Sequence, residues 1–398
     1  MDAKTAVREV IESARSELLE LSHRIHEYPE LGFEEERAAG WMCDVMADAG
    51  FTVERGVCNL PTAFVARAGS GPLHIAICAE YDALPVIGHA CGHNIIASAA
   101  AGAGLGLAKI ADDVGLTITV LGTPAEEVCN AGGKIQMLER GAFDGVHAAM
   151  MVHPGPVDMA APPIIAAAQF DVFYTGKEAH ASAFPELGVN AADALTVAQT
   201  AVGLLRQHIH HTERVHGIIT KGGDAPNVIP VRTSARYIAR AASIEKLAAL
   251  MPRVHRCFEA GAIATGCKYE ITGGDQPYAE MHHDRDLCSL FYENGVALGR
   301  KFADRNPRVT ATGEHRGMGA GSTDMGNVSL KFPSIHPLIG IKSLPAVNHQ
   351  PEFTVYCVTD EGDRAVIDGA ISLAWTAIDA ASDPDLRSRL INRSTRVA

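Results

Sequence analysis

Clusters of basic residues are absent from this sequence of 398 residues, in which 34 lysines and arginines stand against 47 acidic residues and give a formal net charge of −13. Nucleic-acid binding draws its affinity from grouped Lys and Arg side chains that displace counterions from phosphates. The acidic balance therefore disfavours a nucleic-acid partner and favours a small-molecule ligand.

Apolar runs long enough to cross a bilayer are also absent. A transmembrane helix needs about 20 predominantly apolar residues, and the most membrane-like stretch, residues 95–110, is shorter and dominated by alanine and glycine. Residues 1–21 are amphipathic and acidic, unlike the basic and then apolar order of a secretion signal. We therefore expect no transmembrane segment and no membrane partner, and interpret residues 95–110 as a tightly packed internal helix.

The sequence has no CxxC pair, and its nine cysteines are odd in number and follow no repeated spacing. A disulfide framework would show paired, regularly placed cysteines. We therefore expect free thiols and a cytoplasmic location. The length predicts roughly two domains.

Strand-like and helix-like patterns alternate in the first part of the chain. Apolar β-type runs cover 73–78, 116–121 and 148–152, with helical patterns after Asn94 and over 134–140. Such alternation predicts an α/β fold with a mostly parallel sheet flanked by helices. Polar residues follow each run, and open sheets of this kind bind ligands at the carboxyl ends of their strands. These residues are Asp82, Glu126, Glu127 and His153.

A second domain is predicted at 166–277, inserted between catalytic segments 1–165 and 278–398. Its pattern is strand, helix, two strands, helix, strand, which is the order of a ferredoxin-like α+β unit. The predicted elements are strands at 169–174, 217–220, 233–240 and 268–272, with helices at 190–208 and 243–265. A helix over 284–303, a β-like stretch at 334–341 and a helix over 360–380 are expected to complete the first domain.

Metal-ligand chemistry is concentrated in four separate segments. Cys91 and His93 lie two residues apart, a spacing that can converge on a metal from a loop preceding a helix. Glu126 and Glu127 supply carboxylates, and His153 and His349 supply two further imidazoles. This donor set suits Zn²⁺ first, and also leaves Mn²⁺, Co²⁺ or Ni²⁺ open.

Eight ordered motifs resemble the M20 metallopeptidase and amidohydrolase family across nearly the whole chain. Within it the sequence is most similar to the branch of aminobenzoyl-glutamate hydrolases and M20 domain-containing dipeptidases. The motifs are AEYDALP at 79–85, HACGHN at 89–94, GTPAEE at 122–127, MMVHPG at 150–155, EAHAS at 178–182, PNVIP at 226–230, GSTDMGNVS at 321–329 and NHQPEF at 348–353.

The resemblance implies a site for two divalent metal ions, with a general base beside it. It assigns Glu126 as that base, against the alternative of a solvated acidic turn. Many family members carry a His-x-Asp pair where this chain has Glu80 and Asp82, so we expect Asp82 to orient His93 through its second ring nitrogen. The implied metal ligands are Cys91, His93, Glu127, His153 and His349.

The same resemblance implies functional roles for two residues of the predicted inserted domain. His180 is similar to a family histidine that stabilises the developing oxyanion across a dimer interface, and its alternative is a surface histidine in a loop. Asn227 is similar to a substrate-contact residue, and its alternative is a turn residue after Pro226. The resemblance thus also implies a homodimer formed through the inserted domain.

Other polar residues are interpreted as structural. A histidine cluster at 208–216 is typical of a solvated helix end. Ser322, Thr323 and Asp324 lie in a Gly-rich segment that either lines the substrate pocket or makes a tight turn.

The sequence therefore predicts a metal-dependent amidohydrolase that cleaves the amide bond of an N-acyl or aminoacyl amino acid, such as a dipeptide or an aminobenzoyl-glutamate-like conjugate. A non-catalytic metal- or ligand-binding relative is the alternative, but it would have little reason to keep Glu126 beside Glu127. A deaminase-type hydrolase is disfavoured by the missing CxxC pair.

Overall fold

The computed structural model describes residues 2–303 and 321–392. The chain forms two compact units. Unit 1 comprises residues 1–128, 132–163 and 281–398, and unit 2 comprises residues 129–131 and 164–280. Each unit has its own hydrophobic core.

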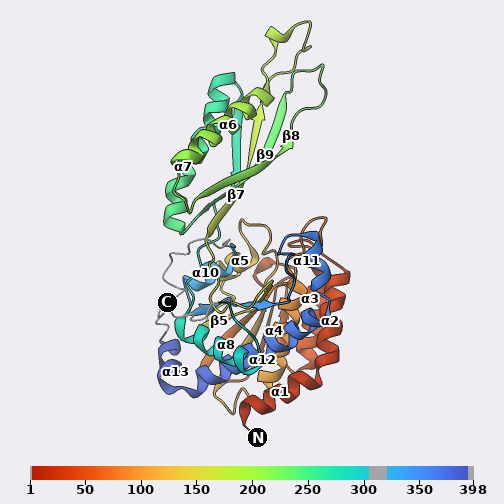
Figure 1. Cartoon of the computed structure of the whole chain (residues 1–398), viewed down its shortest axis with the longest axis vertical. Coiled ribbons are helices and arrows are strands. Elements are labelled where there is room, and N and C mark those ends of the chain that lie inside the picture. The colour runs from red at the N-terminus through yellow and green to blue at the C-terminus, as the bar shows by residue number, and fades with distance from the viewer. Residues whose placement is uncertain (1, 304–320, 393–398) are drawn as a thin grey trace. The chain divides into compact units, whose positions relative to one another are not determined.

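Unit 1 is built on a six-stranded sheet in the order β1-β2-β4-β3-β5-β11 (Figure 1). The four strands from β4 to β11 run parallel, and β1 and β2 add an antiparallel edge. The strands of this sheet are β1 (Thr52–Arg55), β2 (Phe64–Ala68), β3 (Leu73–Ala79), β4 (Leu116–Gly122), β5 (Ala148–Met150) and β11 (Ser334–Ile335). A second, two-stranded sheet pairs β6 (His153–Gly155) with β12 (Leu338–Gly340).

Helices surround this sheet, so that β3 and β4 are buried along nearly their whole length. The helices of unit 1 are α1 (Ala3–Ser13), α2 (Arg15–Glu27), α3 (Glu36–Asp48), α4 (His93–Ala108), α5 (Gly133–Glu139), α8 (Arg285–Ala297), α10 (Met325–Ser329), α11 (Pro351–Tyr356), α12 (Asp360–Ser382) and α13 (Pro384–Ile391), with a short 3₁₀ turn η1 (Val57–Asn59).

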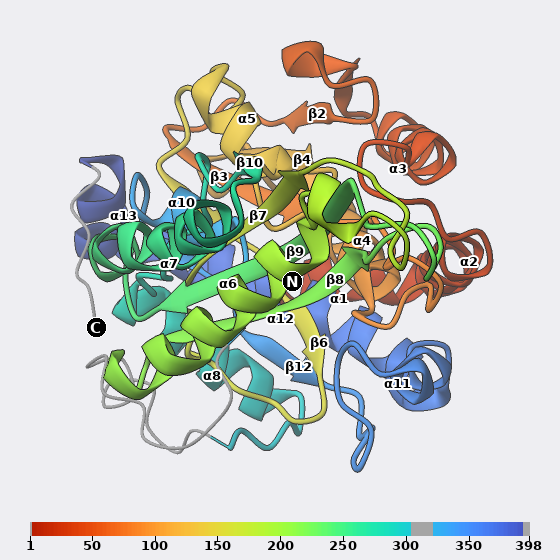
Figure 2. The same cartoon turned by 90° about the horizontal axis from the view of Figure 1, so that it is seen from above.

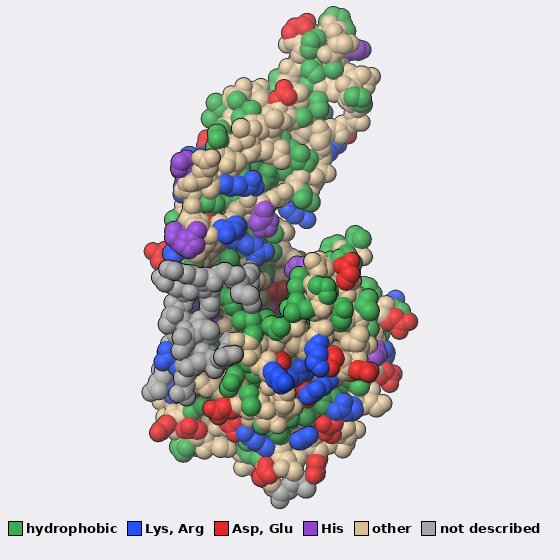
Figure 3. Space-filling view, in the orientation of Figure 1, with side chains coloured by type: hydrophobic (Ala, Val, Ile, Leu, Met, Phe, Trp, Pro, Cys, Tyr) green, Lys and Arg blue, Asp and Glu red, His purple; other side chains and the backbone are tan. Residues whose placement is uncertain are grey.

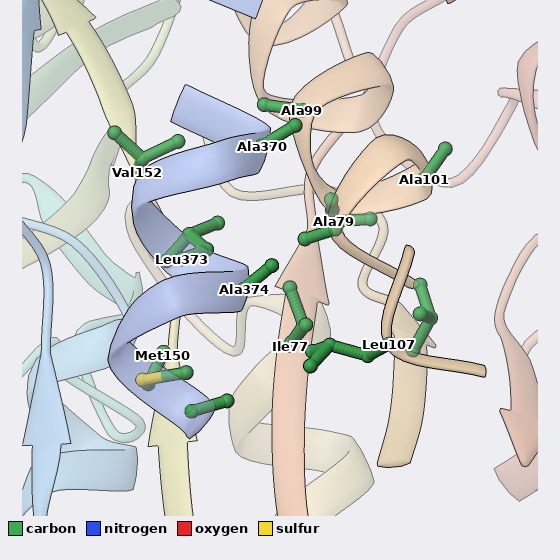
Figure 4. Close-up of a cluster of buried hydrophobic side chains, with 14 of the residues drawn as sticks. Ile77, Ala79, Ala99, Ala101, Leu107, Met150, Val152, Ala370, Leu373 and Ala374 are labelled. Atoms are coloured by element: carbon green, nitrogen blue, oxygen red, sulfur yellow. The ribbon is translucent and has the colours of Figure 1, made fainter. Parts of the chain in front are cut away.

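Helix α4 is the central helix of unit 1, and all its residues except Leu105 and Ala108 are buried. It packs on β3 and β4 and is contacted by α1, α2 and α12. Figure 4 shows Ala370 and Ala374 of α12 lying close to Ala99 of α4 and Ile77 of β3. Small side chains let these backbones approach closely, as expected for the predicted internal helix.

Among the described residues, the helix whose length and composition would allow it to cross a membrane is α12, not the predicted stretch at 95–110. Its most apolar window has a mean hydropathy of 1.2, and 78% of that window is buried inside the protein. The helix packs against α1, α4 and α8. It is therefore placed as a core helix of unit 1.

Two elements predicted in residues 278–398 have different bounds in the structure. The helix expected over 284–303 stops at Ala297, and Gly299 then takes a left-handed φ of 86°, a common way for a helix to end. The β-like stretch at 334–341 divides into β11 and β12, because Pro337 lies between them and has no N–H for a ladder.

Unit 2 is a four-stranded antiparallel sheet in the order β10-β7-β9-β8. Two long helices, α6 and α7, pack side by side on this sheet (Figure 2). This arrangement is the predicted ferredoxin-like α+β fold. Its elements are β7 (Ala166–Thr175), α6 (Ala191–Leu205), β8 (Arg214–Lys221), β9 (Arg232–Ala241), α7 (Ile244–Thr265) and β10 (Lys268–Gly273), with 3₁₀ turns η2 (Pro185–Leu187) and η3 (Arg206–His208).

Charged side chains of both signs are intermixed on the face of unit 1 seen in Figure 3. Elsewhere on unit 1, Arg55 pairs with Asp44 and Arg67 with Glu54 through exposed side chains. Intermixed surface pairs of this kind contribute about 0–1 kcal/mol each, so the stability of unit 1 depends mainly on its apolar core.

The packing of α4 predicts opposite effects for two helical glycines. A Cβ on Gly102 would lie 2.9 Å from both Ala370 Cβ and Leu18 Cδ1, whereas a Cβ on Gly203 of α6 would have no atom within 4 Å. We expect Gly102→Ala to lower the free energy of unfolding by ~1 kcal/mol through overpacking. Gly203→Ala should raise that free energy by about 0.5–1 kcal/mol through helix propensity. Denaturant titration checks both, and equal stabilisation by the two variants would contradict the close packing of α4.

Candidate active site

The polar residues predicted at the strand ends of unit 1 do lie there. Asp82 follows β3, Glu126 and Glu127 follow β4, and His153 follows β5 and opens β6. Because these three strands are parallel neighbours, their carboxyl ends bring all four residues to one edge of the sheet. This edge is the usual ligand position in an open α/β sheet.

Cys91 and His93 reach the same place through the start of α4. Gly92 between them has a φ of 82°, and a Cβ there would stand 2.5 Å from Pro154 Cγ, so only glycine fits. His93 is the first residue of α4 rather than part of a preceding loop, and Cys91 lies outside the helix. The turn at Gly92 therefore solves the problem that residues two apart on a helix diverge.

Among the described residues of unit 1, three groups of donor atoms are close enough to hold metal ions. Within each group the ligand atoms lie within 4.8 Å of one another. The groups are Cys91, His93 and His153; Cys91, Glu127 and His349; and Glu80, His93 and Glu126. All five residues predicted as metal ligands are thus brought together, and Glu80 joins them.

His93 is held in one orientation by Asp82. Its Nδ1 lies 2.9 Å from Asp82 Oδ1, and the other oxygen of Asp82 accepts the Glu127 backbone N–H at 2.9 Å. His93 Nε2 is fully buried and has no hydrogen-bond partner among the described residues. A buried, unpartnered ring nitrogen facing carboxylates and a thiol is what a metal ligand requires before the metal binds. The predicted orienting contact of Asp82 is thus present in the geometry.

The thiol of Cys91 is poised to ionise. Burial opposes ionisation, but the imidazoles of His153, His349 and His93 outweigh it and hold the pKa of this thiol well below its usual range. Its Sγ lies 3.4 Å from His153 Nε2. Metals bind the thiolate rather than the thiol, so the site already favours the ligating form.

Glu127 and His349 form the outer side of this cluster. Glu127 Oε1 lies 3.4 Å from His349 Nε2. Hydrogen bonds to Cys91 and Glu127 raise the pKa of His349 to about 11, and burial followed by the charge of Cys91 raises the pKa of Glu127 to about 7. The His349 side chain is 56% exposed, which makes this the solvent side of the cluster.

Only 7% of the surface of Glu126 is exposed, and its side chain lies beside other carboxylates. Burial, then the charges of Glu80 and Glu127, raise the pKa of Glu126 well above its usual range. A carboxyl group with a raised pKa is suited to accept and return a proton near neutral pH. This geometry does not fit a solvated acidic turn.

A buried lysine compensates these acids, and sequence reasoning missed it. Lys134 is fully buried, and its Nζ lies 2.6 Å from Glu80 Oε1 and 2.5 Å from Asp324 Oδ1. Asp324 Oδ2 also accepts the Lys134 backbone N–H at 2.9 Å. Asp324 therefore balances the buried charge of Lys134 and is not simply a turn residue. The GSTDMGNVS motif that contains Asp324 was the only feature of the sequence that pointed to it.

The two candidate residues of unit 2 lie together on exposed loops. Ala181 N–H donates to Asn227 O at 3.0 Å, and His180 bridges to Val228. His180 Nδ1 accepts the backbone N–H groups of Ser182 and Ala183 at 3.3 and 3.2 Å. In the neutral ring this leaves the proton on Nε2, so His180 presents a hydrogen-bond donor to its surroundings.

Comparisons with known proteins agree with this architecture. Residues 166–265 match the model of a peptidase dimerisation domain. A Bacillus subtilis structure, described as a dinuclear metal-binding peptidase from the M20 family, superposes with a TM-score of 0.67 over 93% of this chain and 99% of that one, at 21% identity. Together with the sheet topology, these matches confirm the predicted fold class.

Curated proteins similar in sequence to this chain include a dipeptidase and a component of an aminobenzoyl-glutamate hydrolase. The chain is 38% identical to the Xaa-Arg dipeptidase of Mus musculus, over 96% of its own length and 90% of that protein. It is 34% identical to one component of the p-aminobenzoyl-glutamate hydrolase of Escherichia coli (strain K12), over 72% of its own length and 63% of that protein.

The lysine beneath the site yields a stability prediction. Lys134→Met leaves Glu80 and Asp324 as uncompensated buried charges, and breaking such a pair costs about 3–5 kcal/mol. We expect a loss of this size in the free energy of unfolding, measured by urea titration without added metal. The exposed Lys331→Met serves as the control, and Lys134→Met/Asp324→Asn should recover part of the loss. Equal stability of the two lysine variants would show that the buried pairing is not needed.

Proposed function

This chain belongs to the M20 peptidase family and is a hydrolase of amide bonds, and from that premise we propose that it cleaves the amide bond of an N-acyl or aminoacyl amino acid with divalent metal ions bound in unit 1. The observation that carries the proposal is the convergence of predicted ligands around His93 Nε2, which makes no hydrogen bond among the described residues, with Glu126 beside them. These ligands are Cys91, His93, Glu127, His153 and His349. A non-catalytic binding relative would have little reason to keep Glu126 beside the ligand Glu127.

The donor set fits two divalent cations. Cys91, His93 and His153 would hold one ion, and Cys91, Glu127 and His349 the other. A thiolate with imidazoles favours Zn²⁺, and Mn²⁺, Co²⁺ and Ni²⁺ remain compatible with the mixed nitrogen and oxygen donors. When bound, such ions lower the pKa of water and polarise a carbonyl oxygen.

Glu126 is proposed as the proton carrier of the reaction. Its carboxylate would take a proton from the attacking water and return it to the leaving nitrogen as the C–N bond breaks. Burial, followed by the charges of Glu80 and Glu127, raises the pKa of Glu126 well above its usual range, which supports this role. Glu127, whose backbone is held by Asp82, would ligate instead, so that the two adjacent carboxylates have different tasks.

His180 is proposed as a donor to the developing oxyanion, in a homodimer formed through unit 2. The match to a peptidase dimerisation domain supports the dimer. The Nε2–H of His180 supplies a donor that would strengthen as the carbonyl oxygen becomes negative. Asn227, whose backbone lies beside His180, is proposed to contact the substrate.

The substrates proposed are dipeptides and acyl-amino-acid conjugates. The similarity to an Xaa-Arg dipeptidase over nearly the whole chain makes dipeptides ending in arginine the first to test. The similarity to a p-aminobenzoyl-glutamate hydrolase supports acyl-glutamate conjugates as a second class.

The proposed location of the protein is the reducing cytoplasm. All nine cysteines are free, which supports this location.

Replacement of Glu126 tests the mechanism. We expect Glu126→Gln to lower kcat by about 10²–10⁴-fold, because a positioned acid–base group contributes that much, while bound Zn²⁺ or Mn²⁺ stays unchanged. Amine release from Xaa-Arg dipeptides, N-acyl amino acids and aminobenzoyl-glutamate, followed by mass spectrometry, measures the effect. Metal content by elemental analysis and the exposed Glu20→Gln variant are the controls. Full turnover by Glu126→Gln with normal metal content would show that another group is the base.

Mixed dimers test the role of His180. If His180 acts in the partner's site, then His180→Ala and Glu126→Gln should each be inactive alone. Co-refolding them should restore about a quarter of wild-type turnover, because half the dimers are mixed and each mixed dimer has one complete site. Activity that stays at the level of the single variants would place His180 in the site of its own protomer, and a monomer in light scattering would exclude the dimer.

A further inference from the structure

The residue before the proposed base has an unusual backbone. Ala125 has a φ of 57°, in the left-handed region that side chains other than glycine rarely occupy. Ala125 is fully buried, so solvent does not hold it there. Its conformation fixes the direction in which the chain leaves towards Glu126, and it persists only where neighbouring groups hold it.

A buried carboxylate from a distant segment holds this residue. Glu35, 90 residues earlier in the chain, accepts the Ala125 N–H at Oε1 with a distance of 2.8 Å. Its other oxygen, Oε2, accepts the Thr62 hydroxyl at 2.8 Å. Glu35 is completely buried, immediately before α3.

The two backbone amides that flank Glu126 are therefore both held by buried carboxylates. Glu35 takes the N–H of Ala125 on one side, and Asp82 takes the N–H of Glu127 on the other. With both flanking amides fixed, the peptide unit that carries Glu126 has little freedom to turn.

The segment that carries Glu35 also packs tightly against this turn. A Cβ on Gly32 would lie 2.9 Å from Ala125 Cβ and 3.1 Å from Val128 Cγ1. The same segment pairs with the loop after β3, where Ala83 N–H donates to Glu30 O at 2.8 Å. Residues 30–35 thus contact the loop after β3, which carries Asp82, and the loop after β4, which carries Glu126 and Glu127.

We propose that Glu35 is a positioning residue for the hydrolysis, which holds Ala125 in its left-handed conformation and so sets where the Glu126 carboxylate points. This inference rests on the proposed function in so far as Glu126 is the base. Glu35 acts through the Ala125 amide and does not touch the substrate. Its task is that of a hydrogen-bond acceptor, so a neutral acceptor of the same shape should replace it.

Three variants separate positioning from other roles. In Glu35→Gln the amide oxygen can still accept the Ala125 N–H and the amide nitrogen can donate to the Thr62 hydroxyl, so kcat should remain within about threefold of wild type. In Glu35→Met both partners lose their acceptor, and kcat should fall by about 100-fold, the loss that a small misplacement of a reacting group produces. KM and bound metal should change little. Glu34→Met, at the exposed neighbouring residue, is the matched control.

A glycine at the left-handed residue provides a rescue. Glycine adopts a positive φ without a steric penalty, so Ala125→Gly in the Glu35→Met background should recover about tenfold of the lost kcat. Ala125→Gly alone should keep near wild-type turnover. A group that served only general stability would lower the free energy of unfolding in Glu35→Met but leave kcat per folded molecule unchanged.

Hydrogen exchange of the metal-loaded protein gives a readout that does not depend on turnover. Peptides covering residues 123–128 should exchange faster in Glu35→Met than in wild type, Glu35→Gln or Glu34→Met. If Glu126→Gln kept full turnover, the base assignment would fail by itself, and this exchange would still decide whether Glu35 holds the turn. The inference is overturned if Glu35→Gln is as inactive as Glu35→Met, if Ala125→Gly gives no recovery, or if exchange and kcat in Glu35→Met match wild type.

Discussion

The site depends on one buried carboxylate, Asp82, which joins three elements of unit 1. It follows β3, it binds His93 at the start of α4, and it accepts the Glu127 N–H in the loop after β4. Burial works against its ionisation, but His93 and the Glu127 amide outweigh burial and lower the pKa of Asp82. The ring orientation of His93 and the path of the Glu126-Glu127 loop are thus set by the same group, and neither could shift without disturbing the other.

Several buried acidic groups lie around Asp82, and their negative charge must be balanced. Two sets of positively charged or protonatable side chains balance it. Lys134 neutralises Glu80 and Asp324 from below the site, whereas His93, His153 and His349 face the thiol of Cys91. Charges in a desolvated site interact strongly. The pKa values of Cys91 and Asp82 are therefore lowered, whereas burial and then the charges of Glu80 and Glu127 raise the pKa of Glu126.

Much of this architecture could be predicted from local patterns, and the remainder could not for a physical reason. Runs such as 73–78 and 116–121 are apolar over a strand length and end at polar residues, so both the strands and the position of Asp82 at a strand end could be predicted from the sequence. The pairing of Lys134 with Asp324 spans 190 residues and that of Glu35 with Ala125 spans 90. No periodicity or spacing encodes contacts between such distant segments; they arise only when the sheet brings the loops together.

The strained backbone of unit 1 shows what this long-range assembly provides. Non-glycine residues with positive φ occur at Ala125 beside the proposed base and at His349 among the proposed ligands, and each such residue costs about 1–3 kcal/mol. Both are tied down by contacts from elsewhere in the chain, Ala125 by Glu35 and His349 by its N–H to Ala90 O at 2.9 Å. The helices that pack on the buried parallel strands β3 and β4 supply the stability that offsets this strain. The rigid core and the strained backbone at Ala125 and His349 therefore depend on each other. The side chains of the site must converge on a small volume, and only a backbone constrained by the rest of the fold can hold them there.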